Sequence, residues 1–121
     1  MGFATRLALY DLSTGTLTTV VASPGGPGTR IEDGRCDRAG NFVFGTMDDG
    51  FSVKFIGQFH RLNAATLAVV KLTLPDVAIP NSTCFSPNGG TLYYCDSMQD
   101  RIMCCDYPSL QNQAYSPESK V

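Results

Sequence analysis

One segment of the chain, residues 29–49 (TRIEDGRCDRAGNFVFGTMDD), gathers eight charged residues around an alternating apolar run. Within it, the adjacent carboxylates of Glu32 and Asp33 offer oxygen ligands of the kind that hard cations prefer. Two interpretations are open at this point. The pair forms one wall of a binding site, or it belongs to a solvated turn in which Arg30 pairs with either carboxylate and Asp33 accepts backbone N–H groups of its own loop.

The other polar groups favour local structure over catalysis. The acidic loop at 48–50 either overhangs the same site or is solvated, and residues 96–97 are typical of a turn after an aromatic-rich strand. His60 lies in an alternating strand and is expected to face solvent, with no nucleophile beside it for a catalytic triad. The glycine-rich stretch 23–30 lacks the Gly-Lys-Ser/Thr sequence of a phosphate-binding loop. We therefore identify no catalytic residue within the chain.

Composition limits the class of protein. The 121 residues carry a formal net charge of −2, with 43% hydrophobic and 17% charged residues, which predicts one small globular domain. Interspersed charges of both signs argue against nucleic-acid binding, and the short apolar runs argue against a membrane span. The first ten residues lack the features of a secretory signal peptide, so we expect a cytoplasmic protein.

The five cysteines are odd in number and form no Cys-x-x-Cys pair. In a cytoplasmic protein this pattern favours buried, reduced thiols over disulfides or a zinc site. The adjacent pair near the C-terminus would point to opposite faces of a strand, which argues against joint metal binding. The cysteines are Cys36, Cys84, Cys95, Cys104 and Cys105.

An internal repeat has a period of about 50 residues. LYDLSTGTL (9–17) aligns with FHRLNAATL (59–67), which matches Leu12 to Leu62, and CCDY (104–107) is a shorter third copy. Each copy indicates a strand that ends in a short polar turn.

A second repeat interleaves with the first. RCDRAGNFVFGTM (35–47) aligns with TCFSPNGGTLYYCDS (83–97), which matches Cys36 to Cys84 and leaves two residues of slack in the turn. Glycine and asparagine between short aromatic or β-branched runs predict a tight hairpin in both copies.

Nine strands follow from these patterns, and no stretch favours a helix, because β-branched residues, glycine and proline interrupt each one. Four short antiparallel strands that recur at this spacing are typical of β-propeller blades. A β-sandwich with coincidental internal similarity is the alternative. The expected strands are 6–12, 16–22, 30–37, 41–47, 57–62, 67–74, 78–85, 91–96 and 101–107.

These strands make two strands of one blade, one complete blade and three strands of another. Because propellers usually need four to eight blades to close, we predict an all-β partial propeller of about two blades over residues 1–110, followed by a polar tail at 111–121. Such a piece leaves blade faces and edge strands uncovered. It is expected to be a truncated or partial product, or a unit that covers these faces by self-association.

Several motifs, taken in order, resemble the gluconolactonase / senescence marker protein (regucalcin) family. They are the Arg-x-Asn-Asp-Gly-like segment at 30–34, Gly-Thr-Met at 45–47, the Asn-x-x-x-Phe-Ser-Pro segment at 81–87 and Tyr-Tyr-x-Asp-Ser at 93–97. The resemblance extends from about residue 7 to residue 107. It implies a six-bladed propeller of antiparallel four-stranded blades, of which this chain corresponds to the central third or slightly more.

The same resemblance implies hydrolysis of sugar lactones such as glucono- or arabinono-lactone, assisted by a divalent cation (Ca²⁺, Zn²⁺, Mn²⁺ or Mg²⁺). In the family, a Glu, an Asn and an Asp from different blades hold this ion in the central channel. A hard cation polarises the lactone carbonyl and lowers the pKa of a bound water that attacks it. A carboxylate near the metal can act as general base.

Matched position by position, Asn81 corresponds to the metal-binding Asn, and Arg30 to an Arg that contacts the sugar hydroxyls. Glu32 takes the place of an Asn that binds substrate or supports the metal site. A carboxylate there adds negative charge, which favours cations, but it loses the amide donor to a sugar oxygen. The Glu and Asp ligands are expected outside this chain, which would hold one protein ligand of three.

Two classes of function remain. The first is a divalent-metal-dependent sugar-lactone hydrolase that this chain represents in part, with a sugar lactone as its partner. The alternative is a non-catalytic propeller fragment or a metal- or calcium-binding module that uses Asn81 and Glu32 without turnover.

Overall fold

The computed structural model describes residues 1–107, so the predicted polar tail at 111–121 lies outside the described residues. All nine predicted strands are confirmed, with ends that differ by a few residues, and the described part of the chain contains no helix. The strands are β1 (Arg6–Tyr10), β2 (Leu17–Ala22), β3 (Thr29–Cys36), β4 (Phe42–Asp48), β5 (Phe59–Leu62), β6 (Val69–Lys71), β7 (Pro80–Phe85), β8 (Thr91–Asp96) and β9 (Ile102–Asp106).

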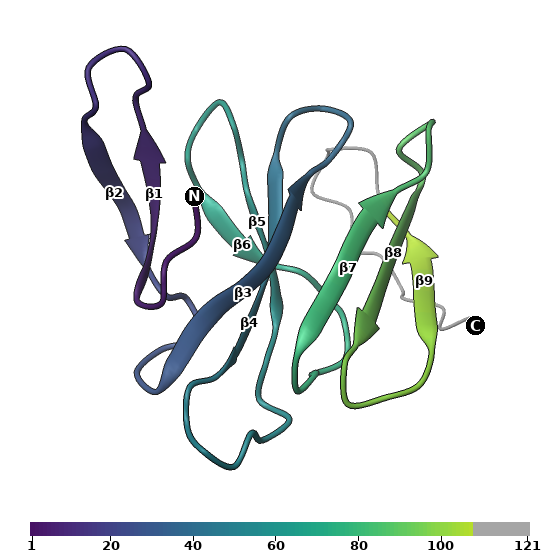
Figure 1. The fold of residues 1–121 in the computed structure, drawn as a ribbon. Coiled ribbons are helices and arrows are strands. Elements are labelled where there is room, and N and C mark those ends of the chain that lie inside the picture. Colours follow the sequence, from purple (N-terminus) through teal and green to yellow (C-terminus); the bar gives the residue numbers. More distant parts are fainter. Residues whose placement is uncertain (108–121) are drawn as a thin grey trace.

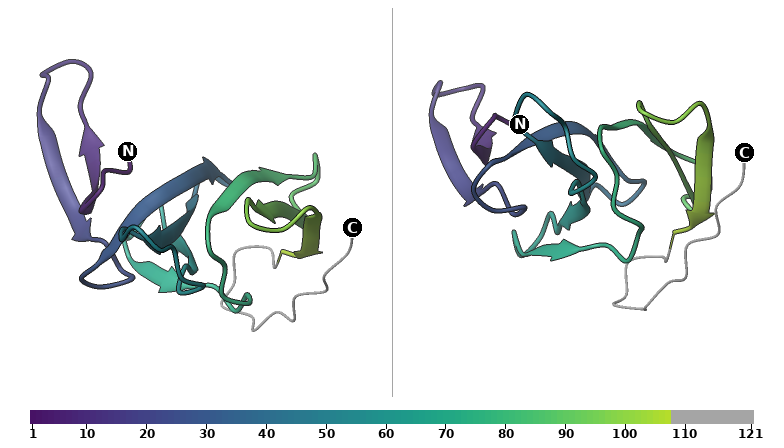
Figure 2. Two further views of the ribbon diagram at one scale, coloured as in Figure 1. Left: turned by 60° about the horizontal axis from the view of Figure 1, so that its bottom comes forward. Right: turned by 90° about the horizontal axis from the view of Figure 1, so that it is seen from below.

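The strands form three antiparallel sheets in chain order: β1-β2, β3-β4-β5-β6 and β7-β8-β9. The sheets stand side by side (Figure 1), and the two further views in Figure 2 show the same succession. The first strands of the second and third sheets, β3 and β7, run in the same direction and contact each other. The predicted division into two, four and three strands is therefore confirmed.

The turns of the first repeat show that its predicted register is wrong by two residues. Asp11 and Asn63 play the same part, because each side-chain Oδ1 accepts the backbone N–H groups two and three residues further along. Leu12 therefore lies in a turn, where it is 91% exposed, whereas Leu62 is a buried strand residue. The alignment by leucine identity failed because the local side-chain hydrogen bonds determine where each turn begins.

The second repeat needs a smaller correction. The hairpin turns are closed by equivalent hydrogen bonds, from the Asp37 N–H to Asn41 O and from the Ser86 N–H to Thr91 O. Asp37 and Ser86 are thus equivalent, so Cys36 corresponds to Phe85 and not to Cys84. The second turn holds one extra residue, and the predicted slack of two was too large.

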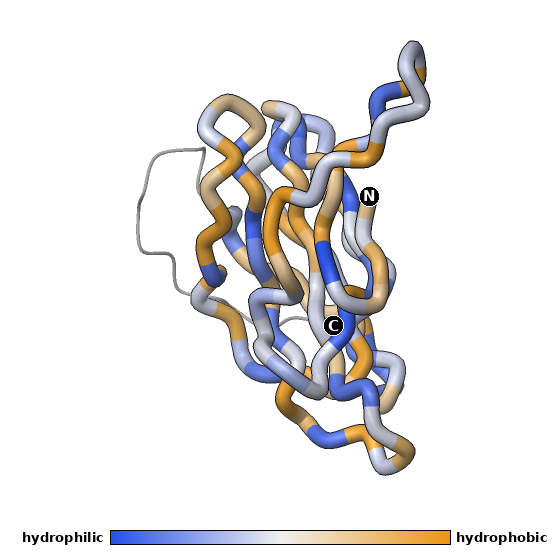
Figure 3. The backbone as a smooth tube through the Cα atoms, turned by 90° about the vertical axis from the view of Figure 1, so that its left-hand side faces the viewer, coloured by the Kyte–Doolittle hydropathy of each residue, from blue (hydrophilic) through white to orange (hydrophobic). Residues whose placement is uncertain are grey.

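The middle sheet is buried on both faces. Val43 and Phe44 are consecutive in β4, so their side chains point to opposite faces, yet neither is exposed. Phe44 packs with Leu7 of the first sheet, and Val43 belongs to the cluster that includes Tyr94 of the third. Hydrophobic and hydrophilic residues are accordingly interspersed along the strands (Figure 3) rather than separated into two halves of the molecule.

The outer sheets are less fully buried than the middle one. Leu9 and Tyr10 of β1 are about half exposed, as is Ile102 of β9. This agrees with the expectation that the described strands leave blade faces uncovered. No helix in the described part of the chain is long and apolar enough to cross a membrane.

All five cysteines are free thiols, as expected, but the expectation that they are buried is wrong for four of them. Only Cys105 is buried, and Cys36 is exposed. The other three are half-buried, since no sheet formed by residues 1–107 packs on the outer face of the third sheet. Burial raises the pKa of the Cys105 thiol to about 12, with Cys104 and Asp106 adding to the shift.

His60 corrects another expectation, because it does not face solvent. It is 4% exposed and stacks on Phe44, with 5.6 Å between the ring centroids. Its Nδ1 is buried and has no hydrogen-bond partner among residues 1–107. Burial lowers the pKa of this imidazole, and Lys71, paired with His60 across β5 and β6, lowers it further. Alternation failed here because neither face of the middle sheet is a solvent face.

We predict that acidification below the ordinary imidazole pKa of 6.5 destabilises the protein through His60. The unfolded chain takes up this proton more readily than the folded chain, so stability is full above pH 6.5 and falls as the pH drops below it. Unfolding in urea at pH 7.5 and pH 5.5 measures the loss. In His60→Gln the loss over this interval is smaller; an equal loss in both proteins would contradict the assignment. The carboxylates of Asp11 and Asp48, whose pKa values are lowered by hydrogen bonds, titrate at more acidic pH.

A polar cluster joins the second and third sheets at the end where the β3–β4 turn lies. Asp37 Oδ2 accepts hydrogen bonds from the hydroxyl of Tyr107 at 2.9 Å and from Asn41 Nδ2 at 3.1 Å. Arg38 donates to two main-chain carbonyls at the end of β7, those of Phe85 and Ser86, both at 3.1 Å. Burial raises the pKa of Tyr107, so its hydroxyl remains a donor at neutral pH.

Removing the buried hydroxyl should weaken this junction. Tyr107→Phe is expected to lower the free energy of unfolding by about 1.5–3 kcal/mol, the range for a hydrogen bond to a charged group, because the Asp37 carboxylate loses the hydroxyl donor. Tyr93→Phe is the matched control: Tyr93 is 38% exposed, and its substitution is expected to change stability by less than about 0.5 kcal/mol. Equal effects of the two substitutions in urea unfolding would refute the role of the hydroxyl.

Candidate functional site

The predicted site residues lie near the starts of two neighbouring strands. Ile31 of β3 pairs with Thr46, and Pro80 of β7 pairs with Asp96, at matching places in the second and third sheets. Glu32 and Asn81, the next residues along, therefore occupy equivalent positions. Because β3 and β7 contact each other and run in the same direction, the fold brings the two segments to the same side of the molecule.

Asn81 is held by a hydrogen bond from its side-chain amide. Asn81 Nδ2 donates to Ser97 Oγ at 2.9 Å, which leaves the carbonyl oxygen Oδ1 available to an incoming ligand. Ser97 directly follows β8, so its role is set by the β7–β8 pairing. The sequence predicts only turn residues at 96–97, and this contact does not follow from it.

Asp96 ends β8 and makes one turn hydrogen bond, as predicted, but its other two partners lie outside the turn. Its carboxylate is completely buried and accepts three backbone N–H groups: Ala78 at 2.8 Å, Ile79 at 3.0 Å and Met98 at 3.1 Å. It thereby fixes both the segment that leads into β7 and the turn that follows Ser97. Asp96 supports the position of Asn81 without facing the site.

Asp33 also accepts a backbone hydrogen bond, as one interpretation predicted, but the donor lies in the next sheet. Asp33 Oδ2 accepts the N–H of Thr83 at 3.0 Å. An open hollow of about 600 Å³ lies along this contact and is lined by residues 33–35 and 81–84. Two strands from different sheets thus share one concave surface.

Arg30 and Glu32 are both half-buried, and neither lines this hollow. The Arg30 Nε donates to the carbonyl oxygen of Ile31 at 3.4 Å, a long and weak hydrogen bond. Most of the guanidinium donors of Arg30 therefore remain available to an oxygen-rich ligand.

The acidic loop at 48–50 is divided between two roles. Asp48 accepts the backbone N–H groups of Gly50 at 2.9 Å and Lys54 at 3.1 Å, and these hydrogen bonds lower the pKa of its carboxyl. This carboxylate closes its own loop. Asp49 instead lies beside a second hollow, described next.

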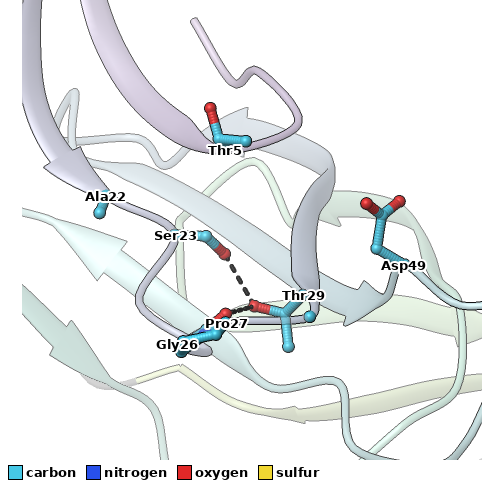
Figure 4. Close-up of a pocket in the computed structure, with 8 residues that line it drawn as sticks. Thr5, Ala22, Ser23, Gly26, Pro27, Thr29 and Asp49 are labelled. Carbon is cyan, nitrogen blue, oxygen red and sulfur yellow. Dashed lines mark hydrogen bonds between the residues drawn. The ribbon is translucent and has the colours of Figure 1, made fainter.

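The second hollow, of about 350 Å³, lies between the β1–β2 hairpin and the start of β3 (Figure 4). Its polar groups come from Thr5, Ser23, Thr29 and Asp49. The hydroxyls of Ser23 and Thr29 are 3.0 Å apart, and Thr29 donates to the carbonyl oxygen of Gly26 at 2.6 Å. Because these hydroxyls bond to each other and to the loop, they stabilise the connection between the first two sheets. The sequence predicts only a glycine-rich loop here.

The donors present fit part of a metal site. Amide and carboxylate oxygens, as in Asn81 and Glu32, suit a hard cation, but Ca²⁺ takes about six to eight oxygen ligands. Residues 1–107 contain no group of three or more His, Cys, Asp or Glu side chains that could hold an ion. The assignments of Arg30, Glu32 and Asn81 thus remain predictions.

Comparison with solved structures identifies the class of fold. The chain superposes on a luciferin-regenerating enzyme with a TM-score of 0.82 at 22% identity, over 98% of this chain and 41% of that one. It also superposes on a calcium-binding regucalcin from Agrobacterium tumefaciens with a TM-score of 0.74 at 35% identity, over 87% of this chain and 35% of that one. The three sheets are blades of a β-propeller, present here in part, and the sandwich alternative is wrong.

Within that class, the chain belongs to the SMP-30/gluconolactonase/LRE-like family, whose model matches residues 1–119. It is 46% identical to an L-arabinolactonase of Azospirillum brasilense over 108 residues, 88% of this chain and 36% of the relative. It is 36% identical to a putative sugar lactone lactonase of Rhizobium meliloti over 80 residues, 66% of this chain and 26% of the relative. The chain thus spans about a third of the length of the curated relatives it matches.

The three hydrogen bonds of Asp96 lead to a stability prediction. Asp96→Ala leaves three N–H groups without their acceptor, and we expect the free energy of unfolding to fall by at least about 3 kcal/mol. The control is Asp100→Ala, at an exposed position in the same loop, which should change stability by less than about 0.5 kcal/mol. Urea denaturation of both variants tests the difference, and a mild effect at Asp96 would show that water replaces its bonds.

Proposed function

We propose that this chain is part of a divalent-metal-dependent sugar-lactone hydrolase and contributes one side of its active site. Family membership and the similarity to the two bacterial lactonases support the reaction class. The geometry of Asn81 is the observation that supports this site. Its Nδ2 donates a hydrogen bond to Ser97, which leaves its Oδ1 available to a ligand. Its strand, β7, contacts β3, the strand that holds Arg30 and Glu32.

Each predicted residue has a separate task in this proposal. Asn81 Oδ1 supplies one oxygen ligand to the cation, and the Glu32 carboxylate adds negative charge nearby. Arg30 donates hydrogen bonds to sugar hydroxyls through a fixed planar group. When bound, the cation polarises the lactone carbonyl and activates water. The remaining ligands and the general base are assigned to parts of the propeller outside this chain.

The proposal also covers the partners of the protein and its cellular compartment. Exposed Leu9 and Ile102 mark faces that further blades, or other copies of this chain, would cover. Five free thiols suit a reducing compartment, which supports the cytoplasm as the site of action. The sugar lactone is the proposed partner.

Calcium binding without hydrolysis is the second candidate. The Agrobacterium neighbour is described as a calcium-binding protein. Glu32 favours this alternative, since a carboxylate attracts a cation but cannot donate to a sugar oxygen as an amide does.

The test is acid release from a panel of aldonolactones, with Ca²⁺, Zn²⁺, Mn²⁺ or Mg²⁺ against a chelator. Because the other ligands must come from further blades or from other copies of this chain, we expect metal-dependent turnover in the assembled protein. This turnover should be reduced at least about 100-fold in Asn81→Ala, since loss of a ligand should cost more than the roughly 10–100-fold typical of a residue that only orients one. Asp100→Ala serves as the control variant. Sedimentation of the same samples records whether copies assemble.

The outcomes separate the two candidates. Metal binding that depends on Asn81, without acid release, would support the calcium-binding function and refute hydrolysis by this chain. Folded protein that neither binds a cation nor releases acid would leave this chain without the proposed site.

A further inference from the structure

The backbone of β7 is irregular immediately after Asn81. The pairing with β8 shifts between Asn81 and Cys84, which marks a β-bulge. Within it, Ser82 has a φ of +59°, a left-handed conformation that is unfavourable for a residue with a Cβ atom. The β7 bulge, residues 81–84, therefore needs support from outside its own strand, because such conformations persist only where the surroundings enforce them.

That support comes from β3 in the neighbouring sheet. Thr83 has no paired residue in β8, because it lies in the bulge, and its N–H donates to Asp33 Oδ2 at 3.0 Å. Thr83 is 3% exposed, so water does not replace this bond readily. A carboxylate is a stronger acceptor than a neutral carbonyl. Asp33 thus holds the centre of the bulge.

The contact also joins the two halves of the candidate site. Asp33 directly follows Glu32, and Thr83 lies two residues after Asn81, so one hydrogen bond connects the two predicted site segments. Asp33, Asn81 and Thr83 also line the open hollow between β3 and β7. A movement of the bulge would carry Asn81 with it and change where Oδ1 points.

We propose that Asp33 is a positioning residue: through Thr83 it holds the β7 bulge, and it thereby sets the position from which Asn81 presents Oδ1 to a divalent cation. The inference rests on the proposed metal-dependent function. It assigns Asp33 the role of a hydrogen-bond acceptor and not that of a metal ligand or general base.

Two substitutions at one position separate these roles. Asp33→Asn keeps an oxygen acceptor for the Thr83 N–H but removes the charge, whereas Asp33→Ala removes both. In the full chain, we expect Ca²⁺ affinity, measured by calorimetry, to fall by about 10-fold or more in Asp33→Ala and to stay within about threefold of wild type in Asp33→Asn. Asp76→Ala, at an exposed position, is the matched control.

A readout that does not depend on metal accompanies the calorimetry. Amide hydrogen exchange at Thr83 should accelerate at least about 10-fold in Asp33→Ala and remain slow in Asp33→Asn. The side-chain amide resonance of Asn81 should shift in the first variant and return toward its wild-type position in the second. Should Asp33→Ala not fold, the double variant Asp33→Ala/Ser82→Gly replaces it, because glycine adopts the left-handed conformation without strain.

Equal loss of Ca²⁺ affinity in both variants, with Thr83 still protected in Asp33→Asn, would overturn the proposal and make Asp33 a ligand. Unchanged exchange at Thr83 in Asp33→Ala would overturn it as well. Absence of any Ca²⁺ binding by the wild-type chain would refute the proposed function instead; the exchange rate and the Asn81 resonance would then still decide whether Asp33 positions the bulge.

Discussion

The structure depends on one constraint: each sheet must bury its faces against its neighbours. Val43 and Phe44 make this plain, because two consecutive residues of β4 are both fully buried although they point in opposite directions. The first packs toward the third sheet and the second toward the first. This face-to-face packing sets the inner strands β3 and β7 next to each other, and the candidate site exists only because of that proximity. No single sheet contains it.

The number of strands and their grouping could be predicted because the turns are encoded locally. Asp37 with Gly40, and Ser86 with Gly89, place polar and glycine residues where the hairpins reverse, and both glycines adopt a positive φ. The register of the first repeat could not be predicted in the same way. Leu12 and Leu62 are aligned in the sequence repeat, but Leu12 lies in an exposed turn and Leu62 in the hydrophobic core. The hydrogen bonds of Asp11 and Asn63 decide the matter, and they become visible only in three dimensions.

The candidate site, too, could be predicted from the sequence only in part. Arg30, Glu32 and Asn81 could be proposed from short motifs, since motif residues stand at fixed distances along a strand. The groups that hold them could not, because their partners lie elsewhere in the sequence: Ser97 is 16 residues from Asn81, and Thr83 is 50 residues from Asp33. His60 was misplaced for a related reason. Strand alternation predicts a solvent face only where a sheet has one.

The junction made by Arg38 has a consequence for how such chains diverge. Its guanidinium binds the carbonyl oxygens of Phe85 and Ser86, atoms that every amino acid presents alike. The side chains at these two positions can therefore drift during evolution without loss of this contact. Gly89 is the exception. Its φ is positive, and a Cβ atom at this position would lie 3.2 Å from the Arg38 side chain. One blade can thus accumulate substitutions at these positions while the hydrogen bonds from Arg38 of the neighbouring blade to its main chain are kept.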